Sequence, residues 1–264
     1  MTAIGKIRVG RLEYRYGSII YEPYYEEYLP IKIMIKNDPK NGEYGAISPF
    51  NVRVPVNGYP LEVIHENYWQ FLKVYEKTPP IKQYFSKYDN RIRWEYDECI
   101  QINNNNVTAE WYKWKDKGFN SQNWIRYPVG TKPEERAKCK YSLTLNDDGT
   151  VNESNKQTYI SSRKVTYVTK YVENVIKYKE FLQLKKILLS GQNILIIEVD
   201  GPHQESLPYY IEKYGVNKNF IINNTVEVTV KNMKILLNDE KHAFGHGYCA
   251  AMELLEITNE VLND

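Results

Sequence analysis

Apolar and polar positions alternate in the first part of the chain. Residues 7–9 read Ile-Arg-Val and residues 31–35 read Ile-Lys-Ile-Met-Ile. Because a strand points successive side chains to opposite faces, this period of two predicts half-exposed β-strands at both places. The Asn, Asp, Pro and Gly residues at 37–42 predict a turn, residues 44–50 a loop, and residues 52–54 a short strand.

A helical spacing begins after this strand, at residues 63–75. Tyr68, Phe71, Leu72 and Tyr75 stand at positions i, i+3, i+4 and i+7, so they form one apolar stripe along a helix. The paired prolines that follow are predicted to end the helix.

The later part of the chain predicts further helices and a buried strand. Residues 168–189 carry valines and leucines at helical spacing, and Gly191 marks the end of that helix. Residues 193–199 are apolar, β-branched and bounded by turn residues, which predicts a buried strand. Residues 217–237 indicate a strand, a turn and a second strand or short helix, and residues 248–257 predict a closing helix.

Residues 81–161 have a weaker pattern, in which aromatic clusters alternate with polar turns. We interpret them as short helices and a hairpin that decorate the rest, since no change in composition marks a linker. The 264 residues have the length of one large domain or two small ones. Strands and helices interleave without a repeating strand-helix-strand rhythm, which favours an α+β fold, with an irregular α/β fold as the alternative.

Charge and hydropathy narrow the classes of function. The 35 basic and 33 acidic side chains leave a formal net charge of +2, which argues against a dedicated binder of duplex DNA but leaves a short or single-stranded nucleic acid open. The apolar run near residues 185–199 is interrupted well before the ~18 residues that a membrane span needs, so we expect a soluble protein. The first residues lack the apolar core of a signal peptide, which favours a cytoplasmic location.

Cysteines and aromatic residues add two expectations. Cys99, Cys139 and Cys249 are odd in number and far apart, so we expect buried thiols in a reducing compartment rather than disulfides or a four-cysteine zinc site. The 24 tyrosines and 5 tryptophans outnumber the 7 phenylalanines. Such side chains suit a cleft that stacks on a base, although Tyr also serves ordinary strands and helices.

The first candidate site lies on the helix predicted at residues 63–75. Glu66, Gln70 and Lys73 are spaced i, i+4 and i+7, so they project from one helix face, with Trp69 beside them. They offer an acid–base group, a polar orienter, a nucleophile and a stacking surface. Partial burial of Lys73 between apolar neighbours would favour its neutral form. The alternative is an ordinary solvated helix face.

Two turns that contain glycine are further candidates. Residues 200–203, Asp-Gly-Pro-His, follow the predicted buried strand, where open α/β sheets bind ligands; a capped Gly-Pro turn is the alternative. Residues 244–248, Phe-Gly-His-Gly-Tyr, open the closing helix, where backbone N–H groups could approach a phosphate. Close packing of this turn is the alternative. At residues 126–130 a surface turn is favoured over a phosphate contact.

The histidines raise the question of a metal site. His242 and His246 are four residues apart, as two ligands on one helix would be, and Asp200 or His203 would complete a set. Gly245 interrupts the helix that this arrangement needs, and the chain has no HExxH or CxxC pattern. We therefore expect no metal.

Several segments resemble the NADAR superfamily. Residues 44–50, Tyr-Gly-Ala-Ile-Ser-Pro-Phe, resemble its Ser-Asn-Phe-Tyr-like loop, and residues 66–73, Glu-Asn-Tyr-Trp-Gln-Phe-Leu-Lys, resemble its helix Glu-His-Tyr-Phe-Gln-Ala-x-Lys-Phe. Later segments resemble the family in the same order. These are a helix at residues 181–191, a strand that ends in acidic residues at 194–201, and a helix with a glycine near its start at 244–254.

The resemblance implies one NADAR-like α+β domain over residues 1–264, with residues 81–161 as an insertion. It also implies an N-glycosidase that breaks the ribose–base bond of an ADP-ribosyl or related nucleotide, for example to remove ADP-ribose from guanine in nucleic acid. Lys73 would trap the ring-opened sugar as a Schiff base, Glu66 would transfer protons, and Asp200 would hold the ribose hydroxyls or assist the base.

The resemblance also implies a set of substrate contacts and needs neither a metal nor another cofactor. A phosphate would lie at the start of the closing helix, and aromatic rings would stack on the substrate. The residues expected to bind substrate are Ser48, Phe50, Tyr68, Trp69, Gln70, Gly245, His246 and Gly247.

Two alternatives stay open. Asn67 stands where the family usually has His, and no Trp-Gly pair follows Asp200, so the chain could be a catalytically inactive protein that binds a nucleotide or ADP-ribose. A metal-dependent hydrolase that uses His203, His242 and His246 is the weaker alternative.

Overall fold

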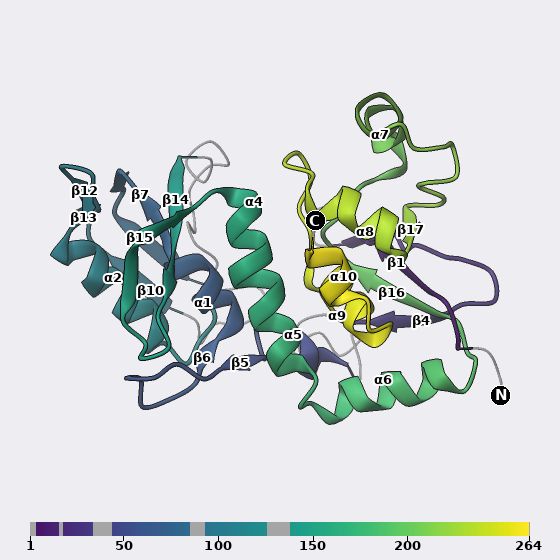
Figure 1. Ribbon diagram of the computed structural model, residues 1–264, viewed down its shortest axis with the longest axis horizontal. Coiled ribbons are helices and arrows are strands. Elements are labelled where there is room, and N and C mark those ends of the chain that lie inside the picture. The colour runs from purple at the N-terminus through teal and green to yellow at the C-terminus, as the bar shows by residue number, and fades with distance from the viewer. Residues whose placement is uncertain (1–3, 16–17, 34–43, 85–92, 126–137, 264) are drawn as a thin grey trace. The chain divides into compact units, whose positions relative to one another are not determined.

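The chain divides into two compact units. The computed structural model describes residues 4–15, 18–33, 44–84, 93–125 and 138–263. Unit 1 comprises Met1–Ser48 and Val172–Asp264, and unit 2 comprises Pro49–Tyr171. Both units mix helices with small sheets, which confirms the α+β class (Figure 1). The segment 81–161 lies within unit 2, and its interpretation as an insertion in a single domain stays a prediction.

A four-stranded sheet forms the centre of unit 1, in the order β17–β1–β16–β4. Its strands are β1 (Ile7–Arg11), β4 (Leu29–Lys32), β16 (Ile194–Glu198) and β17 (Thr225–Glu227). β1, β16 and β4 run parallel, and β17 is antiparallel to β1. Every residue of β16 is buried, which confirms the strand predicted at residues 193–199.

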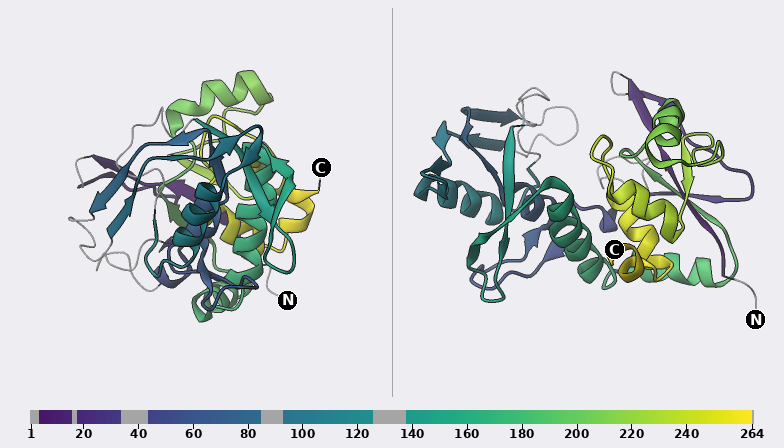
Figure 2. Two further views of the ribbon diagram at one scale, coloured as in Figure 1. Left: turned by 90° about the vertical axis from the view of Figure 1, so that its left-hand side faces the viewer. Right: turned by 45° about the horizontal axis from the view of Figure 1, so that its top comes forward.

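Helices pack on this sheet. α9 lies against β1 and β16, with α6 and α10 beside it (Figures 1 and 2). All residues of α9 except Glu253 are buried, so the predicted closing helix is confirmed, although it begins two residues earlier. Within the described parts of the chain, no helix has both the length and the apolar character needed to cross a bilayer. The helices of unit 1 after the chain returns to it are α6 (Lys179–Leu189), α7 (Leu207–Tyr214), α8 (Val230–Leu237), α9 (His246–Leu254) and α10 (Thr258–Leu262).

Short elements complete unit 1. They are the hairpin β2 (Glu13–Arg15) and β3 (Ser18–Tyr21) and the 3₁₀ turns η1 (Gly45–Ile47) and η3 (Gln204–Ser206). The segment predicted as strand, turn and strand or short helix contains β17 followed by the short helix α8.

β1 is a strand as predicted, but it is not half-exposed. Residues 7–10 are all buried, because β16 and β17 flank β1 and α9 packs against it. Arg8 Nε donates to Thr225 Oγ1 at 2.8 Å, and its guanidinium lies 4.2 Å from the centre of the Tyr25 ring. Arg8, which the alternating pattern placed on the exposed face, is therefore a core residue whose guanidinium is hydrogen-bonded.

Unit 2 is built around the antiparallel sheet β15–β14–β7. β14 (Cys139–Leu145) and β15 (Val151–Gln157) form the predicted hairpin, visible in Figure 2. Gly149 in its turn has φ +84°, and a Cβ there would lie 1.9 Å from the Asn57 backbone oxygen, so only glycine fits.

The other elements of unit 2 are short. The helices are α1 (His65–Phe71), α2 (Ala109–Phe119), α4 (Tyr159–Ser162) and the π-helical segment η2 (Arg163–Val168). The chain leaves unit 2 after Tyr171, within α5 (Thr169–Val175). The remaining strands are β5 (Arg53–Val54), β6 (Val63–Ile64), β7 (Lys73–Tyr75), β8 (Lys77–Thr78), β9 (Ile81–Tyr84), β10 (Arg93–Tyr96), β11 (Cys99–Ile100), β12 (Ile102–Asn103) and β13 (Asn106–Val107).

Two predicted helices are wrong in extent. The helix predicted at residues 63–75 is limited to α1, because the chain beyond Leu72 pairs with β14 as strand β7. The helix predicted at 168–189 is interrupted, because Tyr178 is extended and begins α6 anew. Strand pairing ends the first helix and a local turn interrupts the second, although the apolar spacing continues through both places. The turns predicted at 37–42 and 126–130 lie outside the described residues.

Candidate functional site

Glu66, Gln70 and Lys73 form a hydrogen-bonded series in unit 2. Gln70 Nε2 donates to Glu66 Oε1 at 2.9 Å, and Lys73 Nζ donates to Gln70 Oε1 at 2.8 Å. The amide thus turns its donor to the carboxylate and its acceptor to the amine. Glu66 is 8 % exposed, whereas Gln70 and Lys73 are half-buried. The structure therefore brings together the three side chains that the spacing selected.

Lys73 reaches this series from a strand. It pairs with Ser142 in β14, and its carbonyl oxygen accepts a hydrogen bond from Trp111 Nε1 at 3.1 Å. Since its backbone is bonded to two other segments, the base of the side chain is held in place. The ammonium end then turns back over the last turn of α1 toward Gln70.

Asn67 fixes the helix that carries Glu66 and Gln70. It is fully buried, and its Nδ2 donates to the carbonyl oxygens of Gly118 and Asn123 at 3.1 and 3.0 Å. Its Oδ1 accepts the Ile125 N–H at 2.7 Å. A neutral imidazole offers one donor and one acceptor, so it would not replace all three bonds. Asn67, at the position where the NADAR family usually has His, therefore ties α1 to the end of α2.

Aromatic rings surround the series. The amine of Lys73 lies 4.5 Å from the centre of the Trp69 ring, and this mostly buried indole also contacts Tyr167 at 5.3 Å. Tyr68 stacks on Phe119 with ring centres 5.6 Å apart. The predicted stacking of Tyr68 and Trp69 on a substrate stays a prediction.

Ser48 and Phe50 also have contacts inside their own units. Ser48 is fully buried in unit 1, and its N–H donates to the Gly45 oxygen at 3.2 Å, which ends η1. Phe50, in unit 2, packs on Trp124 with ring centres 4.6 Å apart. Their predicted contacts with a substrate are not tested by these packing contacts.

The start of α9 in unit 1 holds a carboxylate of the chain itself. Glu198, at the end of β16, accepts the Gly247 N–H at 2.7 Å and pairs with His246 Nδ1 at 2.8 Å. His246 Nε2 bonds to the Ile33 carbonyl oxygen at 2.7 Å. Burial opposes both charges, but their mutual attraction outweighs it, so the pKa of Glu198 lies below and that of His246 above the ordinary value. The anion at this helix N-terminus is therefore internal.

Asp200 lies beside the same turn. A Cβ on Gly245 would come within 2.9 Å of Asp200 Cβ and 2.6 Å of Glu198 Oε2, which explains the glycine by close packing. The structure thus brings Asp200 and the turn at residues 245–247 together within unit 1, and Glu66 and Lys73 together within unit 2. The roles expected of Asp200 and of this turn at a ribose and a phosphate stay predictions.

The three candidate histidines do not share one site. Each has its own carboxylate, in the pairs His203–Glu13, His242–Asp239 and His246–Glu198. Among the described residues, the group that could hold a metal ion is Glu13, His203 and Glu205, whose ligand atoms lie within 4.8 Å of one another. The metal set His203, His242 and His246 is therefore wrong as a cluster.

A hollow of about 510 Å³ in unit 2 adjoins β8 and β14 and is lined by lysines, glutamates and Cys139. Burial raises the pKa of the Cys139 thiol, although the nearby charge of Lys73 acts against this. None of the predicted site residues lines this hollow. We therefore keep the Glu66–Gln70–Lys73 series, whose side chains are hydrogen-bonded to one another, as the candidate site.

Sequence reasoning missed the structural roles of two residues that shape these sites, Glu198 and Asn67. Glu198 closes the otherwise apolar run of β16, and a charge in a fully buried strand needs a partner. That signal was available in the sequence. The three backbone bonds of Asn67 join segments more than fifty residues apart, and no local pattern indicates them.

Comparison of the chain with protein-family models, curated proteins and solved structures finds no match. The resemblance to NADAR therefore depends on the residues that carry it, above all residues 44–50 and 66–73. The chemistry available to this chain follows from the geometry of the Glu66–Gln70–Lys73 series.

Proposed function

We propose that the protein is an N-glycosidase that cleaves the ribose–base bond of an ADP-ribosyl or related nucleotide, including ADP-ribose on guanine in nucleic acid. Lys73 is the nucleophile and Glu66 the acid–base group. The observation that carries the proposal is the hydrogen-bonded Glu66–Gln70–Lys73 series, which holds a carboxylate and an amine on the two sides of one amide. The resemblance of residues 66–73 to the NADAR helix supplies the reaction class.

Before the reaction the Lys73 ammonium loses a proton to water and the Glu66 carboxylate takes one up from water, because Gln70 lies between the two groups. The neutral amine attacks the anomeric carbon, the bond from this carbon to the base nitrogen breaks, and the base takes the proton from Glu66. The ring oxygen then leaves the anomeric carbon with a proton from nitrogen, which forms a protonated Schiff base. Water hydrolyses the Schiff base and releases the sugar and the free amine.

Gln70 and Trp69 position the nucleophile in this scheme. The amide of Gln70 keeps the amine of Lys73 from collapsing into a direct ion pair with Glu66, and the Trp69 ring stabilises the charged resting state. Neither side chain takes up a proton. We therefore expect both to affect the rate less than Lys73 and Glu66 do.

Release of ADP-ribose from DNA that carries ADP-ribosylated guanosine tests the proposal. The parent protein is expected to release it, and Lys73→Ala and Glu66→Gln are each expected to lower the rate by about 10²- to 10⁴-fold. Lys77→Ala is the matched control, because Lys77 is 54 % exposed and pairs with Glu98 on the surface. Release by Lys73→Ala and Glu66→Gln at the parent rate would overturn the assignment.

The alternative of an inactive nucleotide-binding protein is weaker than the sequence suggested. One of the two reasons for this alternative was that Asn67 replaces the usual His. The hydrogen bonds of Asn67 to three backbone groups give this residue a structural role instead. Calorimetry with ADP-ribose separates the two functions, because binding by a protein that releases no product would favour the alternative.

A further inference from the structure

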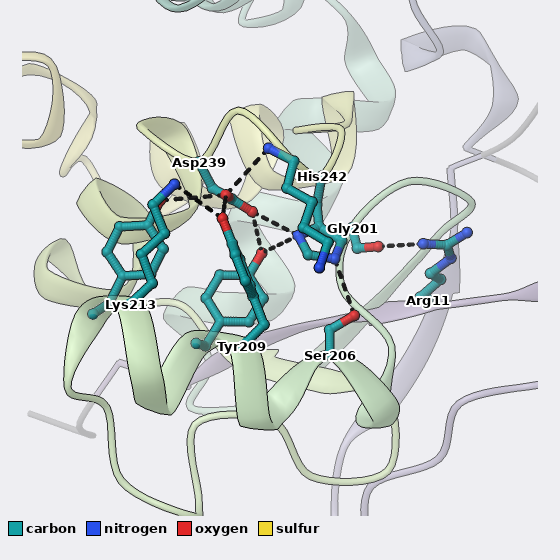
Figure 3. Close-up of polar contacts among 10 residues, drawn as sticks. Arg11, Gly201, Ser206, Tyr209, Lys213, Asp239 and His242 are labelled. Carbon is teal, nitrogen blue, oxygen red and sulfur yellow. Dashed lines mark hydrogen bonds and ion pairs between the residues drawn. The ribbon is translucent and has the colours of Figure 1, made fainter.

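Ser206, His242 and Asp239 lie in a hydrogen-bonded line in unit 1. Ser206 Oγ is 3.0 Å from His242 Nε2, and His242 Nδ1 is 2.6 Å from Asp239 Oδ2. The two contacts use the two different ring nitrogens, so the imidazole bridges a hydroxyl and a carboxylate (Figure 3). This is the order of groups that activates serine for acyl transfer.

Asp239 has the surroundings that this role requires. Its side chain is 0 % exposed and accepts hydrogen bonds from the hydroxyls of Tyr209 and Tyr210 at 2.6 and 2.7 Å, and from the Lys241 N–H at 3.2 Å. Burial alone would raise the pKa of Asp239, but these bonds and that of His242 outweigh it and hold the pKa well below its ordinary value. The carboxylate is therefore ionised.

The ionised carboxylate selects the tautomer in which His242 can act as a base. A carboxylate only accepts hydrogen bonds, so His242 Nδ1 carries the hydrogen that faces Asp239. Nε2 of the neutral ring then presents its lone pair to the Ser206 hydroxyl. The imidazole is thus oriented as a base toward Ser206.

Ser206 lies where the 3₁₀ turn η3 continues into α7, with helical backbone angles of φ −79° and ψ −11°, so its hydroxyl does not cap α7. It precedes α7, and within the described residues its side chain makes no capping bond to that helix. Thr108, Thr158 and Thr229 do cap their helices, with side-chain oxygens that accept a backbone N–H. The half-buried Ser206 instead points to His242, whose side chain is 14 % exposed (Figure 3). A small electrophile can therefore reach the hydroxyl.

We propose that Ser206 is the nucleophile of a second reactive site that hydrolyses small activated esters, with His242 as the base and Asp239 as the residue that orients it. Ser206 Oγ attacks the ester carbonyl carbon while its proton passes to His242 Nε2. The bond from this carbon to the leaving oxygen breaks, and His242 returns the proton to the alcohol. Water, activated by His242, then releases the carboxylic acid from Ser206.

The backbone beside Ser206 limits the substrate class. The Leu207 N–H donates to the Gln204 oxygen, and Pro208 has no N–H. These two positions therefore offer no donor to the oxyanion that forms during acyl transfer, a contribution that is usually large. We accordingly assign activated esters with good leaving groups, and not amides, to this site.

Covalent labelling of the full chain with a fluorophosphonate tests the assignment directly. Ser206 Oγ forms a bond to phosphorus, fluoride leaves, and His242 takes the proton, so peptide mapping should find the added mass on the peptide that contains Ser206. Hydrolysis of p-nitrophenyl acetate should fall by about 10²-fold or more in Ser206→Ala and in His242→Gln. This result is independent of the proposed glycosidase, whose residues lie in unit 2.

Ser190→Ala is the matched control and should keep the parent labelling and hydrolysis. Ser190 also adjoins a helix end, but its hydroxyl donates to the Ile187 carbonyl oxygen at 2.7 Å instead of facing an imidazole. Label on another residue, or no label on a parent protein that circular dichroism shows to be folded, would overturn the proposal. Mapping on the parent chain gives this answer even if a variant fails to fold.

Discussion

Each unit contains a carboxylate linked to a cationic side chain, but the two arrangements differ in what surrounds them. In unit 1, Glu198 is almost fully buried, pairs directly with His246 and accepts the Gly247 N–H. In unit 2, Gln70 lies between Glu66 and Lys73 and is hydrogen-bonded to both, and Lys73 is half-buried.

The comparison sets a pair of charges with a structural role beside the series that we propose to be reactive. Glu198 and His246 satisfy each other and nearby backbone groups, so their charges stabilise the fold. The amine of Lys73 donates to a neutral amide and lies near an indole, and we propose that it reacts after losing a proton. A buried carboxylate thus stabilises the fold in unit 1, and we propose that the one in unit 2 takes part in catalysis.

The largest expected effect on stability comes from His246→Gln. Removing the imidazole leaves the Glu198 carboxylate buried without its cation, and we expect unfolding to become easier by about 3–5 kcal/mol. Chemical denaturation of both proteins measures the difference. His203→Gln is the control, because His203 is 31 % exposed beside Glu13, and its loss should cost only about 0–1 kcal/mol.

The contribution of this pair should depend on pH in a defined direction. The raised pKa of His246 gives stability that is complete below the unfolded value of about 6.5 and lost as pH rises through the folded pKa. The lowered pKa of Glu198 gives stability that is present above about 4.3 and lost as pH falls. The gap between parent and His246→Gln should therefore be widest between about pH 4.5 and 6.5. If His246→Gln kept the parent stability but lost glycosidase activity, His246 would have a catalytic role. The contrast between a structural pair in unit 1 and a reactive series in unit 2 would then be wrong.

A smaller effect is expected from Asn67→Ala in unit 2. The change leaves the Ile125 N–H and two carbonyl oxygens without their partner, which should destabilise the protein by about 2–3 kcal/mol. Thermal unfolding measures this, with Asn155→Ala as the exposed control. A stable Asn67→Ala protein would show that the amide does not hold α1 in place.

The smallest effect is expected from Gln70→Leu, which breaks the series without removing its reactive ends. The rate of ADP-ribose release should fall about tenfold, or ~1.4 kcal/mol, because Lys73 loses its positioning partner. The stability should change by less than about 0.5 kcal/mol at this half-buried position. Steady-state kinetics with the DNA substrate measure the rate, and an unchanged rate would show that Gln70 does not position the amine.

The grouping in unit 2 was predictable because it is local. Glu66, Gln70 and Lys73 lie within eight residues, so their spacing brought them together even though the predicted helix was too long. The strand pairing of Lys73 with β14 could not be predicted from the local pattern, because its partner Ser142 is almost seventy residues away. The buried strand β16 and the hairpin of β14 and β15 were likewise visible as continuous local patterns.

Groupings in unit 1 depend on residues that are distant in sequence. Ser206 and His242 are 36 residues apart, and Glu198 and His246 are 48 apart, so no spacing rule connects them. The sequence did mark the histidines, but it offered a shared metal only as the weaker alternative, and it did not indicate the separate carboxylates that the fold supplies. The buried Arg8 shows the same limit, because the alternation around it could not reveal that both faces of β1 are covered.

The most direct test of the central claim is reductive trapping of the Schiff base. The protein is incubated with ADP-ribosylated guanosine DNA and sodium cyanoborohydride, which reduces the carbon–nitrogen double bond to a stable amine, and its peptides are then mapped by mass spectrometry. Our account predicts that the sugar is attached to the peptide through Lys73 and that Lys77→Ala traps it as well as the parent does. Product release with the sugar attached to another lysine, or to none, would contradict it.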